Sequence, residues 1–307
     1  MRVAIGVLLL ATFGAAAAPK AGSFAVGVLR RDGIVIPVAA WNGKSWSDDW
    51  PNPADPGKLV VPINVPSVPS GWWGPTGPLE TWQAWVGTRP PADVHVLQPD
   101  WVKAFCARQV GLRTDYRPAE PPPPFDVEPY PKDGIVVSPP WPVERIEIVR
   151  TTGPDPAAIA SVLTDEFNRA ERETAGRFSH PANASVREAF TPTIEAMYAH
   201  GGEPRAYYLE ATREYETAVS HECLAIAFGT GWFVRENGKF RSLAMAVDLL
   251  DCERHGASYM QPFGVVRIGT RLFWIAQFSS IDRERYAIIE PKAKAVDAVV
   301  NAWGGGC

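Results

Sequence analysis

The chain has 307 residues, and its 34 Asp and Glu against 30 Lys and Arg give a formal net charge of −4. This length is enough for two domains, and a hydrophobic content of 46% is enough to bury sizeable cores. A slightly negative chain without a basic run argues against nucleic-acid binding and against electrostatic adhesion to anionic lipid.

Residues 1–18 have the pattern of a secretory signal peptide. Met1-Arg2 supplies a basic start, residues 3–13 form an apolar run, and Ala15 to Ala18 offer small side chains for cleavage. The run is too short to span a bilayer, and no later stretch reaches about 20 apolar residues. The sequence therefore predicts a secreted or periplasmic protein with no membrane span after cleavage, and an uncleaved anchor is the alternative.

Proline and tryptophan divide the rest of the chain into two regions. Of 30 prolines, 25 lie at or before Pro156, and nine of the 12 tryptophans lie at or before Trp141. A composition shift of this size marks regions that are built differently. Residues 19–117 are expected to form a Trp/Pro-rich, mostly β domain with strands at 23–29, 34–41, 58–65, 81–86 and 94–97 and one short helix at 100–108.

Residues 118–153 have the composition of a linker or surface strap. Pro121 to Pro124 are consecutive, which favours an extended polyproline II conformation. The segment Asp133-Gly134-Ile135-Val136-Val137 repeats the pattern of residues 32–36 and could add a strand at 133–138 to the first domain. Chance is the alternative, because Asp-Gly before β-branched residues is common turn chemistry.

Residues 154–307 are predicted to form an α+β domain, an antiparallel β-meander sheet covered by an N-terminal and a C-terminal helix. Asp155 and Pro156 have the chemistry of a helix start. The spacing of Val296, Val299, Val300 and Trp303 favours a closing helix over 291–303. Strands are expected at 194–198, 205–215, 263–268, 271–277 and 285–290, with a hairpin over 223–252 among them.

The hairpin carries the strongest local signal in the chain. Asn-Gly at 237–238 is typical of a two-residue type I′ turn, so partners across it have numbers that sum to 475, as Glu236 and Lys239 do. Cys223 and Cys252 have the same sum, and a non-hydrogen-bonded pair places Cα atoms about 4.5 Å apart, within disulfide range. In the same register Trp232 and Phe228 share one face with Met245 and Val247, and the other face carries mostly small residues.

Four cysteines allow three pairings, and the hairpin register selects Cys223–Cys252. This leaves either a Cys106–Cys307 disulfide, which would tie the two halves together, or a free or intermolecular Cys307. A Cys₂His₂ zinc site is a weaker alternative, since the register would bring His221 and His255 close to Cys223 and Cys252. An exported chain meets oxidising conditions, so we expect disulfides and no metal.

No catalytic motif stands out. A carboxylate at Asp248 on an apolar face would have a raised pKa, as a general acid requires, and Glu210 is its candidate partner. Glycoside hydrolysis needs two carboxylates roughly 5–10 Å apart, a distance that the sequence does not give. The structural alternative is that Asp248 pairs with Arg213 or caps a turn, so the chain is more readily interpreted as a protein that is not an enzyme.

Trp72 and Trp73 stand between prolines in a Gly-Trp-Trp-Gly segment, where a loop would expose their rings. Aromatic faces bind the apolar faces of sugars and of proline-rich peptides, although a small β domain also uses tryptophan as core. The leading hypothesis is an exported non-catalytic binding protein with a glycan or an extended peptide as ligand and no cofactor. The alternatives are a secreted hydrolase using Asp248 with Glu210, or a cell-surface or assembly component; the sequence leaves the oligomeric state open.

Overall fold

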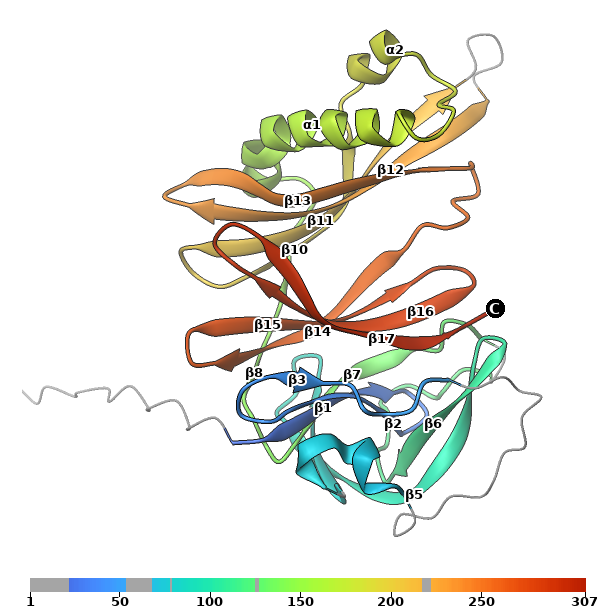
Figure 1. The fold of residues 1–307 in the computed structure, drawn as a ribbon, viewed down its shortest axis with the longest axis vertical. Coiled ribbons are helices and arrows are strands. Elements are labelled where there is room, and N and C mark those ends of the chain that lie inside the picture. The colour runs from blue at the N-terminus through green and yellow to red at the C-terminus, as the bar shows by residue number, and fades with distance from the viewer. Residues whose placement is uncertain (1–21, 54–67, 78, 125–126, 217–221) are drawn as a thin grey trace, which may run out of the picture.

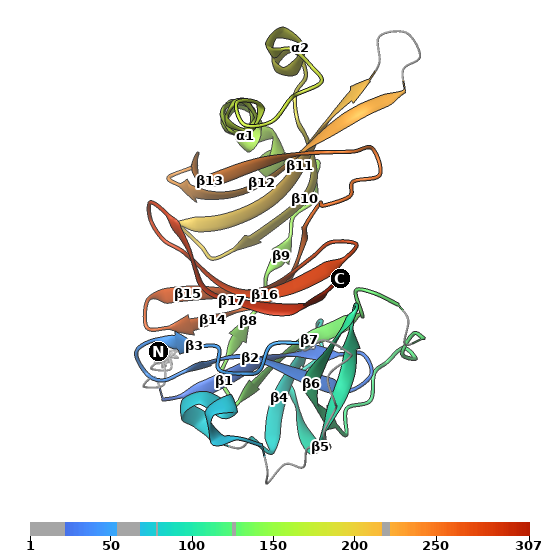
Figure 2. The ribbon, with the colours of Figure 1, turned by 45° about the vertical axis from the view of Figure 1, so that its right-hand side comes forward.

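The computed structural model describes residues 22–53, 68–77, 79–124, 127–216 and 222–307. Over these residues the chain is 54% strand and 12% helical, and it is a stack of a helical layer, two five-stranded sheets and a β-barrel (Figures 1 and 2). The predicted α+β fold is therefore wrong. The expected signal peptide at 1–18 and the expected strand at 58–65 lie outside the described residues.

The first part of the chain closes into a six-stranded barrel in the order β1-β7-β4-β5-β6-β2, with β1 pairing β2 to complete the circle. The segment at 132–138 supplies β7, which pairs with both β1 and β4. A two-residue strand, β3 (Trp46–Ser47), extends from β2. The barrel strands are β1 (Phe24–Arg30), β2 (Ile34–Trp41), β4 (Thr81–Val86), β5 (Ala92–Ala104), β6 (Ala107–Thr114) and β7 (Lys132–Ser138).

The helix predicted at 100–108 is instead the tip of the β5–β6 hairpin. The chain reverses at Phe105, which has a positive φ of 58°, and at Cys106. Val102 and Ala104 are buried on either side of exposed Lys103, which is the alternation of a strand. Over so short a window, apolar residues fit the helical and the strand period equally well.

The middle sheet has the order β17-β16-β15-β14-β8 and is buried between the other two sheet layers. Its β17 replaces the predicted C-terminal helix. Register shifts at Glu284/Arg285 and at Ile288/Ile289 show bulges in the β16–β17 pairing, and such bulges let helix-like spacing arise in a strand. Its strands are β8 (Val143–Glu144), β14 (Tyr259–Ile268), β15 (Arg271–Ser279), β16 (Arg283–Pro291) and β17 (Val296–Gly306).

The outer sheet has the order β13-β12-β11-β10-β9 and carries the helical layer on its outer face. Ile159, Leu163 and Phe167 form the apolar stripe of the long helix and pack on this sheet, so the predicted N-terminal helix is present. The elements are β9 (Glu147–Ile148), α1 (Pro154–Ala175), α2 (Ala184–Ala189), β10 (Thr193–His200), β11 (Arg205–Glu216), β12 (Cys223–Glu236) and β13 (Lys239–Leu250).

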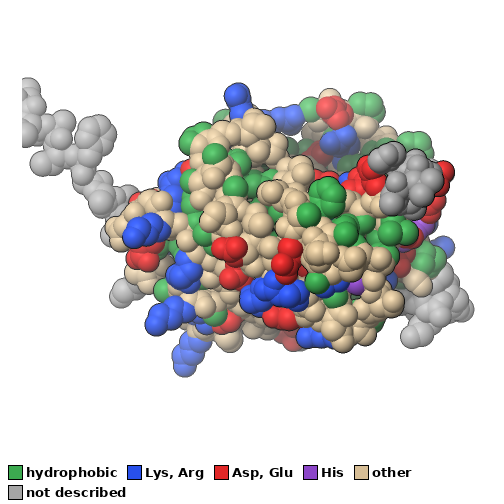
Figure 3. Space-filling model, turned by 90° about the horizontal axis from the view of Figure 1, so that it is seen from above, with side chains coloured by type: hydrophobic (Ala, Val, Ile, Leu, Met, Phe, Trp, Pro, Cys, Tyr) green, Lys and Arg blue, Asp and Glu red, His purple; other side chains and the backbone are tan. Residues whose placement is uncertain are grey.

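The exposed side of α1 is solvated and locally neutralised. Arg169 lies 2.7 Å from Glu166 and 2.8 Å from Glu173, ion pairs at helical spacing. Figure 3, which looks onto this end of the molecule, shows acidic and basic side chains interspersed. No helix in the described part of the chain has the length and apolarity needed to cross a bilayer.

The β12–β13 hairpin turns at Asn237-Gly238, as predicted, and then departs from the predicted register. A bulge at Trp232/Phe233 shifts the pairing by one residue. Because a slip of one residue exchanges the two faces of a strand, the predicted grouping of all large side chains on one face is wrong beyond the bulge. Met245 now lies opposite Gly231, while Trp232 packs edge-on against Trp274 of the middle sheet.

The small residue Gly229 of β12 allows α1 to pack close to the sheet. A Cβ placed on Gly229 would lie 2.6 Å from the Phe167 ring and 2.6 Å from the Met245 side chain. Glycine is therefore required where α1 meets the sheet.

Both disulfides are formed within the chain. Cys223 joins Cys252 across the β12–β13 hairpin, with Cα atoms 5.9 Å apart. Cys106, at the tip of the β5–β6 hairpin, joins Cys307 after β17 across a separation of 201 residues. The second bond fixes the end of the chain to the barrel.

Removing the long-range disulfide is expected to cost more stability than removing the hairpin disulfide. In the loop-entropy account, the Cys106–Cys307 bond contributes about 5 kcal/mol and the Cys223–Cys252 bond about 3–4 kcal/mol to the free energy of unfolding. Paired Cys→Ser variants, unfolded in guanidinium chloride beside the oxidised wild type, measure both values. Equal or reversed costs would contradict the account.

Candidate functional site: the tryptophan pocket of the barrel

Trp72 and Trp73 lie on a short 3-10 helix, η2 (Ser70–Thr76), that packs against β1 and β2. The two rings differ in environment, because Trp73 is only 3% exposed and belongs to the barrel core whereas Trp72 is half-buried. The sequence predicted that a loop would expose both rings, but only Trp72 is accessible, and only in part.

Trp50 holds the two rings in place. Its ring centroid lies 5.7 Å from that of Trp72 and 5.3 Å from that of Trp73, and its Nε1 donates to the Val110 carbonyl oxygen at 3.0 Å. The hydrogen bond ties the aromatic cluster to β6. The rings are therefore positioned by regular strands, although they belong to irregular segments.

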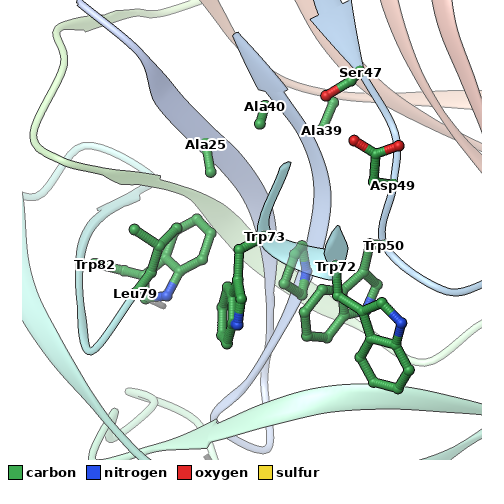
Figure 4. Close-up of a pocket in the computed structure, with 11 residues that line it drawn as sticks. Ala25, Ala39, Ala40, Ser47, Asp49, Trp50, Trp72, Trp73, Leu79 and Trp82 are labelled. Carbon is green, nitrogen blue, oxygen red and sulfur yellow. The ribbon is translucent and has the colours of Figure 1, made fainter. Parts of the chain in front are cut away.

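A pocket opens between this cluster and the barrel strands (Figure 4). Small side chains leave the space on the strand side, and Asp49 and Ser47 stand across it from Trp82. Its cavity volume is about 20 Å³, room for one water-sized chemical group. The lining residues are Ala25, Pro37, Ala39, Ala40, Ser47, Asp49, Trp50, Trp72, Trp73, Leu79 and Trp82.

Three polar atoms on residues that line this pocket are buried without a hydrogen-bond partner among the described residues. They are Nε1 of Trp73, Nε1 of Trp82 and Oγ of Ser47. An unmet buried donor or acceptor costs about 1–3 kcal/mol. Exposed Asp49 adds a carboxylate at the same pocket. The residues around the pocket thus carry two unpartnered indole N–H groups and an unpartnered hydroxyl, together with the carboxylate of Asp49.

The structure does not bring Asp248 and Glu210 together. Asp248 is exposed on the edge strand β13 opposite Phe228, whereas Glu210 is 3% exposed on β11 opposite Thr230. With β12 between them, strand spacing and rise place their Cα atoms about 12 Å apart. Glu210 Oε1 instead accepts the Met260 N–H at 2.6 Å between the two sheets.

The possible zinc ligands are also accounted for where the structure describes them. Cys223 and Cys252 are disulfide-bonded, so neither can act as a thiolate. His255 is exposed and its Nδ1 lies 2.6 Å from Asp251. His221 lies outside the described residues. Asp251, Glu253 and His255 form an exposed group that interacts internally.

Sequence reasoning singled out Trp72 and Trp73 from their local setting but could not find the rest of the pocket. Trp50, Trp82 and Ser47 come from segments up to 35 residues apart and meet only because the barrel closes. The tryptophan content was the one available signal, and it does not distinguish core from pocket.

Comparisons with protein-family models, with curated proteins and with solved structures found no match for this chain.

Burial of Glu210 predicts a distinct pH dependence of stability. Desolvation raises the pKa of this carboxyl from 4.5 to about 7, with Met260 N–H and Tyr208 OH opposing the shift and Glu195 adding to it. Because the folded pKa is the higher one, the folded state holds the proton between these values, and stability falls as pH rises from about 4.5 to 7.

Glu210→Gln should remove this fall. At pH 8 the variant is expected to exceed the wild type by about 2–3 kcal/mol in the free energy of unfolding, whereas near pH 4 the two should be similar. Urea unfolding of both proteins across this pH range measures the difference in their free energies of unfolding. The contributions of the other titrating groups cancel in this difference. A pH-independent difference would sink the assignment.

Proposed function

We propose that this protein is a non-catalytic carbohydrate-binding protein whose contact site is the tryptophan pocket of the barrel. The observation that carries the proposal is that Ser47, Trp73 and Trp82 line one pocket and each carry a buried polar atom without a partner. Partly exposed Trp72 lines the same pocket. A sugar has both parts of the complementary chemistry, an apolar ring face and hydroxyl groups that donate and accept.

The geometry supports a definite mode of binding. A pyranose ring would stack on the accessible face of Trp72 while one of its hydroxyl oxygens enters the cavity and accepts from an indole N–H. Another hydroxyl would donate to the carboxylate of Asp49. Because the cavity admits only one small group, most of the ligand would remain at the surface. The protein would thus contact one sugar residue of a longer glycan.

An exported location supports the same function. Disulfides persist in oxidising compartments, and the described chain contains two of them and no free cysteine. Together with the N-terminal pattern at 1–18, this favours a secreted or periplasmic protein that meets glycans outside the cytoplasm. Cys307 is bonded to Cys106 within the chain and is not a free thiol.

Truncating Trp72, on which the sugar ring would stack, should weaken binding without unfolding the protein. A panel of neutral cell-wall oligosaccharides is titrated by calorimetry against the wild type and against Trp72→Ala. We expect at least a tenfold loss of affinity, about 1.4 kcal/mol, because stacking on this ring is lost. The melting temperature should change little, since Trp72 is only half-buried.

Phe190→Ala is the matched control, because Phe190 is an aromatic residue that is 53% exposed and does not line this pocket. It should bind neutral oligosaccharides as the wild type does. Asp49→Asn removes the charged acceptor from an exposed position and should weaken binding severalfold. Binding of proline-rich peptides in place of glycans, or no binding in either panel, would overturn the carbohydrate assignment.

A further inference from the structure

A row of four side chains crosses the middle sheet close to the end of the chain. Strand register places Met260 opposite Phe278, Phe278 opposite Arg285, and Arg285 opposite Trp303. Directly opposed residues of neighbouring strands point to the same face. Met260 and Phe278 belong to the core between the middle and outer sheets, so this row lies on the face towards the outer sheet.

Arg285 is the unusual member of the row. The other arginines of this sheet each have a carboxylate partner, namely Glu144 for Arg267, Glu290 for Arg271 and Asp282 for Arg283. Arg285 has none within 4.0 Å among the described residues. Its Nη1 donates to the Asn301 side-chain oxygen at 3.1 Å, and its Cζ lies 4.0 Å above the centroid of the Phe278 ring.

The guanidinium of Arg285 is therefore held in place but not neutralised. One face is covered by Phe278, and partial burial lowers the pKa of the group without a carboxylate to offset that effect. Tyr208 is the titratable group that faces it from the outer sheet. Neighbouring Glu284 is engaged elsewhere, with its carboxylate 2.6 Å from buried Lys132.

This arginine lines a pocket of about 210 Å³ together with Trp303. The volume is below the range of about 300–1,000 Å³ that is typical of sites for drug-sized ligands. Ser258 brings a hydroxyl group to the same lining, whereas the hydroxyl of Ser280 already donates to Asp282 at 2.5 Å. The Trp303 ring is 42% exposed. A small ligand could therefore meet a cation, a hydroxyl group and an aromatic face at once.

The Arg285–Trp303 side of the pocket is fixed by the end of the chain. The Cys307 N–H donates to the Asp282 carbonyl oxygen at 2.8 Å, and the Cys106–Cys307 disulfide anchors the same residue to the barrel. A Cβ on Gly306 would lie 2.7 Å from the Trp303 ring, so glycine there lets the indole lie against its own strand. Side chains that are already fixed in place lose less conformational entropy when a ligand binds, which favours binding at this pocket.

We propose that this pocket is a second ligand site, which binds a small carboxylate attached to a ring. The carboxylate would accept hydrogen bonds from the free edge of the Arg285 guanidinium, a geometry that favours paired N–H···O bonds. The ring, a pyranose or an aromatic one, would stack on Trp303. The site is separate from the tryptophan pocket of the barrel and does not depend on it.

The test compares charged probes with their neutral counterparts by calorimetry at low salt. Glucuronate against glucose tests the sugar form of the ring, and benzoate against benzyl alcohol tests the aromatic form. We expect at least one carboxylate to bind the wild type at least tenfold more tightly than its neutral counterpart. Equal affinity within both pairs would overturn the proposal.

Variants then locate the site. Arg285→Gln keeps a polar side chain beside Asn301 and should lose at least tenfold in affinity for the carboxylate. Arg285→Lys keeps the charge, so its affinity should lie between those of Arg285→Gln and the wild type. Trp303→Ala at an exposed position should weaken binding severalfold and provides the test if the Arg285→Gln protein does not fold. Trp72→Ala should bind the carboxylate as the wild type does, which separates this site from the first. Undiminished binding by both Arg285→Gln and Trp303→Ala would refute the assignment.

Discussion

Burial of the middle sheet on both faces is the constraint on which the rest of the molecule depends. One face shares a core with the outside of the barrel, where Phe273 and Ile275 meet Val26 and Ile36. The other face shares a core with the outer sheet, where Trp274 packs against Trp232. A sheet covered twice needs apolar residues at successive positions and not at alternate ones, which explains the run from Phe273 to Ala276. The barrel and the outer sheet are therefore both positioned by their packing against the middle sheet.

The junction between the barrel and the middle sheet also contains a buried ion pair. Lys132 on β7 lies 2.6 Å from Glu284 on β16, and both side chains are almost fully buried. Burial lowers the pKa of Lys132, while Glu284 acts against that shift. Tyr286 OH and Gln277 Nε2 donate to the same carboxylate, at 2.7 and 3.0 Å. A buried pair adds little net stability, but breaking it would leave a charge uncompensated, so it fixes how the layers meet.

Local chemistry in the sequence predicted the local features well. The Asn-Gly turn at 237–238 is present, the Cys223–Cys252 disulfide is formed, and most strands lie where alternation and turn residues indicated. The Cys106–Cys307 disulfide joins distant residues, and the sequence left it open. The fold class failed because residues 100–108 and 291–303 have apolar spacings that fit a helix, whereas in the structure they belong to the β5–β6 and β16–β17 hairpins, whose strands pair with their neighbours in sequence. The bulge at Trp232/Phe233 leaves no trace in the sequence, yet it reverses the faces of the strand beyond it. Closure of the barrel depends on pairing between β1 and β7, more than 100 positions apart.

The candidate sites likewise combine features that the sequence could suggest with features that only the fold determines. A tryptophan pair between prolines drew attention to residues 72–73, but which ring is accessible depends on Trp50, which the fold brings to them. The row that contains Arg285 could be found only from the register of three strand pairs. Sequence patterns can suggest which kinds of side chain are available for binding, whereas the convergence that makes a site is a property of strand pairing.

Unmet polar groups distinguish these pockets from the polar clusters that only hold the fold. Glu171, on the inner face of α1, is buried, but it accepts from Arg213 and Tyr215 at 2.5 Å each, so a ligand would have to displace bonds already made. Three residues with unpartnered polar atoms around one pocket are different, and so is a guanidinium that stacks on one aromatic ring without a carboxylate partner, because one ligand could satisfy such groups together. Binding sites in this chain are therefore best sought where the fold leaves polar groups both unmet and adjacent.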